Sequence, residues 1–186
     1  MQRIYRWQPA HGSGLEHMIL TQDEGMIVAE GVVAGGDDES SPFGCSYRIE
    51  CDAGWRTRSV EVRVAGGASL VLTADGEGRW RDAHGRALAQ LDGCIDVDIS
   101  ATPFTNTLPI RRLSARPARP TELHVAWIRL PALDVQAALQ IYTRLADGRY
   151  RFEAPDSRFK AVLEVDGDGV VLDYPALFRR VEADGC

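Results

Sequence analysis

Glycine-containing polar clusters interrupt this chain at short, regular intervals. They lie at 35–44, 52–55, 65–69, 74–78, 82–85, 145–148 and 165–169. Glycine reaches the backbone conformations that tight turns require, and clusters of this kind close β-hairpins. Because a hairpin pairs its two strands antiparallel, the spacing predicts an antiparallel sheet.

The runs between these clusters have the pattern of β-strands. Val60, Val62 and Val64 alternate with Glu61 and Arg63, as expected for a strand with one apolar face. Further runs rich in β-branched and aromatic residues lie at 26–33, 69–74, 122–130 and 159–165. We therefore predict a mainly β fold with about a dozen strands in one strongly curved sheet, closing wholly or partly on itself.

Helical periodicity is scarce. The segment 175–183 is the better candidate, because Pro175 suits the first position of a helix. The segment 133–146 is ambiguous, and alternation of polar and apolar residues favours a strand from about Leu139. We expect one or two helices to cover an opening of the curved sheet.

Composition limits the classes of function. A chain of 186 residues with 45% hydrophobic and 26% charged residues suits one globular domain over 1–186. The net charge of −6 disfavours nucleic acid as a partner. No apolar run is long enough for a signal peptide or a membrane span, so we expect a cytoplasmic protein that is not integral to a membrane. The four cysteines, at 45, 51, 94 and 186, are expected to be reduced.

The segment 91–113 is the most unusual part of the chain. Asp96 and Asp98 alternate with apolar residues, although aspartate is a poor strand former. A solvated outer face is the favoured interpretation, because buried carboxylates need partners. If the two face inward, an arginine at 56, 58, 111 or 112 would have to pair with them.

The residues that follow Asp98 suggest two further roles. Thr105 and Asn106 can bond to nearby backbone in a rigid loop stiffened by Pro103 and Pro109. Arg111 and Arg112, treated as neighbours in a strand, would face opposite ways, so one of them could hold a phosphate or a sugar hydroxyl.

Aromatic residues mix with arginine at two other places. Tyr5 and Trp7 share one strand face near the N-terminus, and Trp55 precedes Arg56 and Arg58. Core packing is the favoured role for these aromatic rings.

No familiar catalytic or metal-binding pattern is present. The chain lacks a G-x-S-x-G turn, a G-x-x-x-x-G-K loop and an H-E-x-x-H pair, and its four histidines are widely spaced. The DGDG sequence at 166–169 is explained by a hairpin turn. We expect no cofactor and no metal.

Several segments together resemble a family of bacterial proteins described as "putative glycolipid-binding". They are residues 3–7, Tyr47, the spacing from Asp52 through Trp55 to Arg58, the Asp96–Asp98 pair and, above all, TPFTNTLPIRRL at 102–113. The resemblance implies a fold similar to that of the lipoprotein-localisation carriers, which is an incomplete barrel plugged by helices around a hydrophobic cavity. It also implies a cavity for acyl chains with polar groups at its mouth. The absence of a signal peptide and a lipid-attachment cysteine leads us to expect a cytoplasmic ligand.

Three hypotheses follow. The leading one is a non-catalytic binder of a glycolipid or another amphiphile. Its candidate ligand-binding residues are Trp7, Trp55, Arg58, Asp96, Asp98, Thr105, Asn106, Arg111, Arg112 and Tyr142. The second is an enzyme acting on a lipid-like or sugar-like substrate, with Asp96 or Asp98 as acid or base. The third is a structural or partner-binding domain that uses a sheet edge or the loop 35–42.

Overall fold

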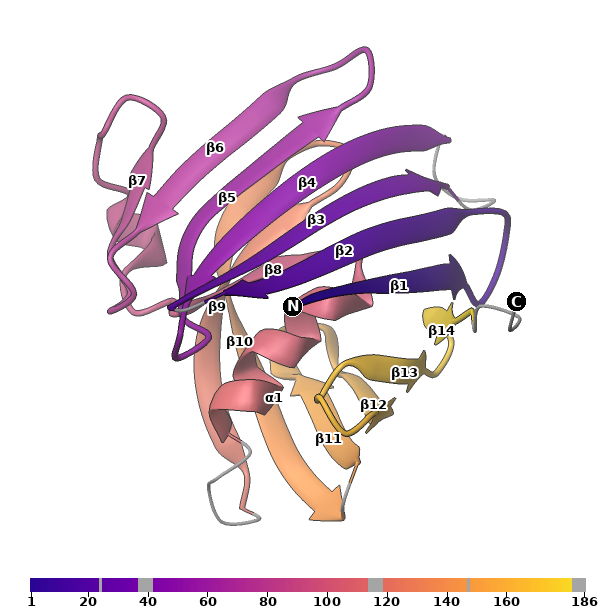
Figure 1. Ribbon diagram of the computed structural model, residues 1–186. Coiled ribbons are helices and arrows are strands. Elements are labelled where there is room, and N and C mark those ends of the chain that lie inside the picture. Colours follow the sequence, from indigo (N-terminus) through magenta and orange to yellow (C-terminus); the bar gives the residue numbers. More distant parts are fainter. Residues whose placement is uncertain (24, 37–41, 114–118, 147, 182–186) are drawn as a thin grey trace.

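Fourteen strands form one open sheet in the computed structural model (Figure 1). The described residues are 1–23, 25–36, 42–113, 119–146 and 148–181. The strand order is β7-β6-β5-β4-β3-β2-β1-β14-β13-β12-β11-β10-β9-β8. The strands span Gln2–Pro9, Leu15–Asp23, Met26–Gly35, Phe43–Asp52, Thr57–Val64, Ser69–Ala74, Trp80–Asp82, Asp96–Ile99, Thr121–Arg129, Asp134–Ala146, Arg149–Ala154, Phe159–Val165, Val171–Tyr174 and Phe178–Arg180, for β1 to β14 in turn.

The sheet has two arms that meet where β1 pairs with β14. We call β1 to β7 the N-terminal arm and β8 to β14 the C-terminal arm; in Figure 1 the first runs from indigo to magenta and the second from pink through orange to yellow. Neighbouring strands are antiparallel except β8 and β9, which are parallel. The sheet is not closed into a barrel, but its β8 end lies near β5, where Val97 N–H donates to Thr57 Oγ1 at 3.1 Å. The expected mainly β, incomplete barrel is confirmed.

Aspartate side chains stabilise the turns that the glycine clusters predicted. Asp52 Oδ1 accepts from the backbone N–H groups of Gly54 at 2.9 Å and Arg56 at 3.1 Å. The carboxylates of Asp75, Asp82 and Asp166 accept in the same way from the backbone two and four residues further along. Each aspartate thus supplies an acceptor for backbone N–H groups of a tight turn.

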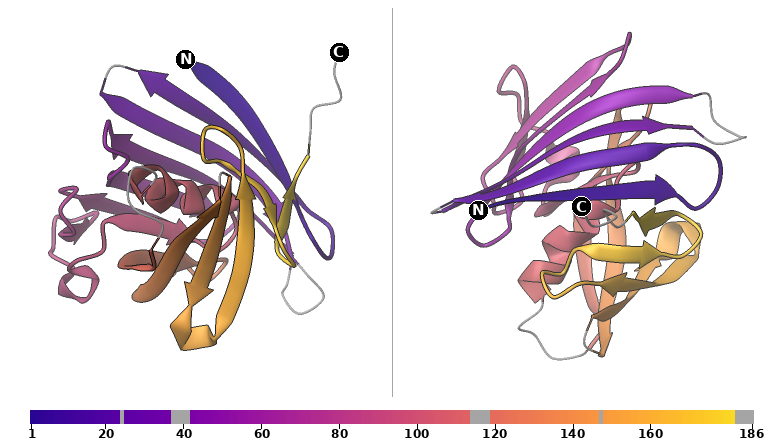
Figure 2. Two further views of the ribbon diagram at one scale, coloured as in Figure 1. Left: turned by 90° about the horizontal axis from the view of Figure 1, so that it is seen from below. Right: turned by 45° about the vertical axis from the view of Figure 1, so that its right-hand side comes forward.

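One helical segment lies inside the curved sheet, between its two arms (Figure 2). It starts as a 3₁₀ turn at Pro103–Asn106 and continues as α1, Thr107–Leu113. Two short 3₁₀ turns, at Ala89–Leu91 and Pro155–Ser157, are the other described helical pieces. The helical segment joins two apolar clusters, because Phe104 and Leu108 pack with the N-terminal arm and Ile110 and Leu113 with the C-terminal arm.

This helix corrects the expectation of a rigid irregular loop at 102–112, and with it the placement of Arg111 and Arg112 in a strand. Thr102 caps the helical segment, accepting from Phe104 N–H at 3.0 Å, and Pro103 occupies the next position. Nearly all of its residues are buried, so the apolar stripe that identifies a surface helix is missing from the sequence.

The helix expected at 175–183 is not present in the part of that segment that the structure describes. Ala176 has a φ of 65° in a tight turn, and Tyr174 pairs with Phe178 across a hairpin. β14 then pairs with β1. The backbone hydrogen bonds of Phe178–Arg180 are thus made with neighbouring strands and not within a helix. Residues 182 and 183 lie outside the described part of the chain.

The ambiguous segment 133–146 is a strand, as favoured for its second half. β10 begins at Asp134, five residues earlier than the expected start near Leu139. It pairs with β9 on one side and β11 on the other.

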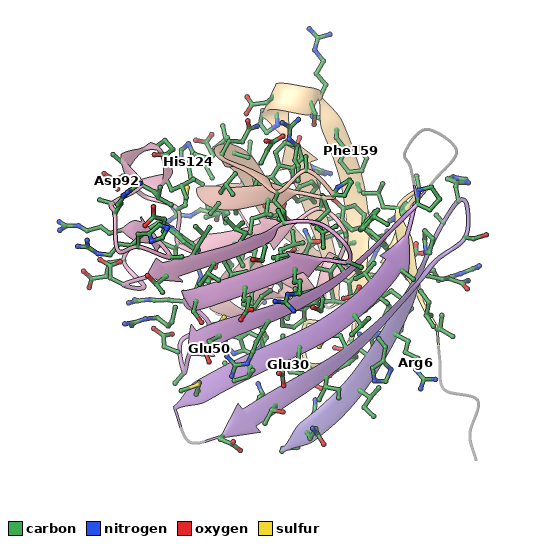
Figure 3. All side chains as sticks on the ribbon, turned by 90° about the horizontal axis from the view of Figure 1, so that it is seen from above. Arg6, Glu30, Glu50, Asp92, His124 and Phe159 are labelled. Atoms are coloured by element: carbon green, nitrogen blue, oxygen red, sulfur yellow. The ribbon has the colours of Figure 1, made fainter. Side chains whose placement is uncertain are left out.

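The outer face of the N-terminal arm carries charged side chains among exposed apolar ones such as Ile4, Val32 and Val71. Figure 3 shows Arg6, Glu30 and Glu50 on the side of these strands that is turned away from the helix. Arg6 Nε contacts His17 Nδ1 at 3.2 Å, and Arg48 lies 3.5 Å from Glu30. No helix among the described residues is long and apolar enough to cross a membrane.

Candidate functional site

Two hollows open on the concave side of the sheet. The first has a volume of about 240 Å³ and lies between the inner face of the C-terminal arm and the segment that runs from β8 into the helix. Its apolar wall includes Trp127, Leu139, Phe152, Phe159, Tyr174 and Phe178. The polar residues Asp98, Thr102, Asn106 and Gln140 also line it.

A chain of hydrogen bonds orders the polar side of the first hollow. Asn106 Nδ2 donates to the Tyr142 hydroxyl at 2.8 Å, and that hydroxyl donates to Gln140 Oε1 at 3.2 Å. Gln140 Nε2 donates in turn to Asp98 Oδ2 at 2.7 Å, while Thr105 donates to Oδ1 at 2.8 Å. Asp98 therefore accepts on both oxygens, which fixes its carboxyl group at the wall.

The two aspartates of β8 both face the helical segment, so the expectation of a solvated outer face is wrong. Asp96 is fully buried, and Arg112 holds it through two hydrogen bonds: Nε to Oδ1 at 3.1 Å and a short contact from Nη2 to Oδ2. Burial raises the pKa of Asp96 and of Asp98, and hydrogen bonds from Arg112 and from Thr105 with Gln140 oppose the shifts. β8 lies between the N-terminal arm and the helical segment, which explains why both carboxyl groups need partners.

The second hollow, of about 370 Å³, lies against the ends of β1 to β4. Trp7, Leu15, Val33, Phe43 and Leu130 contribute its apolar wall, and His11 and Glu16 are polar residues of its lining. Ser100, Leu177 and Phe178 line both hollows, so the two hollows adjoin each other.

The comparisons with known proteins agree with this architecture. The family described as "putative glycolipid-binding" matches residues 4–180, nearly the whole chain. The chain belongs to this family. The crystal structure of a DUF1089 family protein from Pseudomonas aeruginosa is similar, with 38% identity and a TM-score of 0.79, and the match covers 92% of this chain and 94% of that one. No curated protein matches.

Three of the candidate ligand-binding residues line one of these two hollows. Asp98 and Asn106 line the first, and Trp7 lines the second while its Nε1 donates to the Val171 carbonyl at 2.9 Å. Thr105 and Tyr142 are buried and support the polar wall through the hydrogen bonds given above. The segment 102–113, which carries the strongest resemblance to the family, thus supplies part of the wall of the first hollow.

The remaining candidates contact neither hollow. Asp96 and Arg112 bind each other, and Arg112 lines a separate hollow together with Asp52 and Arg56. The Arg111 guanidinium stacks on the Trp55 ring at 5.0 Å, and Nη1 donates to the Asp168 carbonyl at 3.2 Å. Arg58 lies at the surface, 3.9 Å from Asp52.

Sequence reasoning missed Glu16, Gln140 and Trp127. Glu16 is 3% exposed and lies on an inner-facing position of β2. Glu16, Met18 and Leu20 occupy every second position of the strand, so the two apolar residues could have placed Glu16 on the inner face. No group of three or more metal-ligating residues is found in the described part of the chain.

Proposed function

We propose that this protein binds a glycolipid or a related uncharged amphiphile, with the acyl chain in the first hollow and sugar oxygens against its polar wall. The observation that carries the proposal is the composition of that wall. Aromatic and aliphatic side chains line most of it, and Asp98, Asn106 and Gln140 are grouped on one part. Pockets for amphiphiles combine a large apolar surface with a few placed polar groups.

Family membership supports the same proposal, because the family is described as "putative glycolipid-binding". The size of the hollows also fits. The first hollow alone is smaller than the roughly 300–1,000 Å³ of common ligand pockets, and the two adjoining hollows together reach that range.

Titration of the purified full chain with dodecyl β-D-maltoside, kept below its micelle concentration, tests the proposal. Ala138 lines the first hollow, whereas its neighbour Ala137 is exposed and does not. We expect Ala138→Trp to fill the hollow and weaken binding at least about tenfold, which corresponds to about 1.4 kcal/mol. The matched Ala137→Trp variant is expected to bind like the wild type. Equal affinity of all three proteins, or no binding by the wild type, would contradict the proposal.

A second candidate function is catalysis with Asp98 as acid or base. It is favoured by the position of Asp98 on the hollow and by the raised pKa that burial gives it. Asp96 does not share this role, because both of its oxygens bind Arg112. Mass spectrometry of the maltoside recovered from the titration would show cleavage that Asp98→Asn abolishes if this candidate is correct.

A further inference from the structure

Glu16 is a buried carboxyl group with only one of its oxygens bonded. It lies on β2 and is 3% exposed. The Tyr47 hydroxyl donates a short hydrogen bond to Oε1. The other oxygen, Oε2, is buried and has no hydrogen-bond partner among the described residues. Leaving a buried polar atom unpaired costs stability, so the position of Oε2 needs an explanation.

The fold is arranged to bring Tyr47 to this carboxyl group. Tyr47 lies on β4, two strands away from Glu16, and Gly31 lies on β3 between them. The Tyr47 ring occupies the space that any β-carbon at Gly31 would need. The glycine therefore allows the ring to lie across β3 and reach β2. The Tyr47 hydroxyl also lies 3.3 Å from Thr102 Oγ1, at the cap of the helical segment.

These contacts also locate the proton of the carboxyl group. Burial raises the pKa of Glu16 to about 8, and the Tyr47 and Thr102 hydroxyls only partly offset this effect. Because Oε1 accepts from Tyr47, the proton of the neutral carboxyl group belongs on Oε2. In this arrangement, Oε2 of the neutral form can donate a hydrogen bond.

Glu16 lines the second hollow, whose other walls are largely apolar. Thr102 lines the first hollow and contacts Tyr47, so the Glu16–Tyr47–Thr102 cluster lies where the two hollows adjoin. We propose that the second hollow is a binding subsite in which Glu16 donates a hydrogen bond to an uncharged oxygen, such as an ester, ether or sugar oxygen, of the amphiphile in the first hollow. This inference rests on the proposed function.

Two substitutions of Glu16 test the subsite in the full chain with dodecyl β-D-maltoside as the probe. Glu16→Gln keeps a neutral donor at this position, and we expect its affinity to stay within about twofold of the wild type. Glu16→Leu removes the donor and is expected to weaken binding by about three- to tenfold. Glu50→Leu is the matched control, since Glu50 is a carboxylate that lines neither hollow and bonds Ser59 at 2.7 Å. It is expected to bind like the wild type.

Infrared difference spectroscopy reads out the same contact without removing it. Addition of the maltoside to the wild type should shift the C=O stretch of a protonated carboxyl group, and the shifted band should be missing from Glu16→Gln. This readout remains decisive if Glu16→Leu fails to fold.

Each other outcome overturns the inference. If Ala138→Trp weakens binding but Glu16→Leu does not, the second hollow is not a subsite and the proposed function stands. If Glu16→Gln loses as much affinity as Glu16→Leu, or no carboxyl band shifts, Glu16 is not a neutral donor. If the wild type binds no maltoside, the proposed function fails together with the inference.

Discussion

The buried carboxyl groups of the two arms differ in how they are compensated. On β8, in the C-terminal arm, Asp96 is paired with Arg112 and Asp98 accepts from Thr105 and Gln140. On β2, in the N-terminal arm, Glu16 Oε1 accepts from Tyr47, and Oε2 has no hydrogen-bond partner among the described residues. Buried polar groups are usually compensated, so the incomplete compensation at Glu16 is consistent with the binding role that we propose for it.

The helical segment explains the difference. It supplies Thr105 and Arg112 to β8, two of the three residues that compensate Asp96 and Asp98. Glu16 lies across the sheet from Trp7 on one side and Val33 on the other, and neither side chain bonds to it. Polar residues on the helix therefore stabilise one arm, whereas the other arm has an unsatisfied acid beside a hollow.

The largest effect is expected from breaking the Asp96–Arg112 pair. Arg112→Met leaves an unpaired buried carboxylate and should lower the free energy of unfolding by about 3–5 kcal/mol, measured by urea denaturation at pH 7. Adding Asp96→Leu to this variant should recover much of the loss, because the uncompensated charge is then gone. A double variant as unstable as the single one would show that the pair acts through packing.

The pH dependence of stability should separate Glu16 from the other acids. Between pH 4.5 and about 8 the unfolded chain ionises at Glu16 while the folded protein keeps the proton, so this group lowers stability as pH rises. The effect is about 1.4 kcal/mol for each unit of pKa difference. We expect wild type and Glu16→Gln to unfold at similar urea concentrations near pH 4, and the variant to be more stable by a few kcal/mol at pH 8. Identical pH profiles would contradict a neutral Glu16.

Removing one partner of Asp98 should have a smaller effect than removing Arg112. Gln140→Leu deletes the donor to Oδ2 and the acceptor of the Tyr142 hydroxyl, and we expect a loss of about 1–3 kcal/mol in the free energy of unfolding. Gln136→Leu, at another position that lines the first hollow, is the control and should change stability little. Similar losses in both variants would point to the new leucine as the cause.

The smallest effect is expected for an ion pair at the surface. Arg58 lies 3.9 Å from Asp52, and both side chains are substantially exposed. Arg58→Met should change the free energy of unfolding by less than about 1 kcal/mol, with unchanged affinity for dodecyl β-D-maltoside. A large loss of affinity would indicate that Arg58 contributes to the binding site after all.

Most of the sheet could be predicted from local patterns, whereas the helix could not. The strand at Thr57–Val64 follows from alternating valines and the turns from the aspartate–glycine clusters. The helix at Thr107–Leu113 is buried nearly all round, so it lacks an amphipathic stripe, and Pro103 before it and Pro109 within it suggest a loop. Residues Phe178–Arg180 were expected to be helical but form a strand, because their backbone pairs with β1.

The candidate site was predictable only in part, because it too depends on the tertiary arrangement and not on local patterns alone. The resemblance at 102–113 indicated the segment, and Asn106 and Asp98 do line the first hollow. Arg58 and Trp55 carry equally suggestive chemistry but lie elsewhere. Residue type marks a group that can bind, and only its position decides whether it faces a hollow.

The sequence by itself determined the period-two strands and the turns between them, because both depend on side chains and backbone within a few residues. The tertiary structure alone decided which acids are compensated. Arg112 reaches Asp96 from 16 residues away, and Tyr47 reaches Glu16 across Gly31 from 31 residues away. Such pairings depend on strand register and on where the helix lies inside the sheet, and neither is encoded in a local pattern.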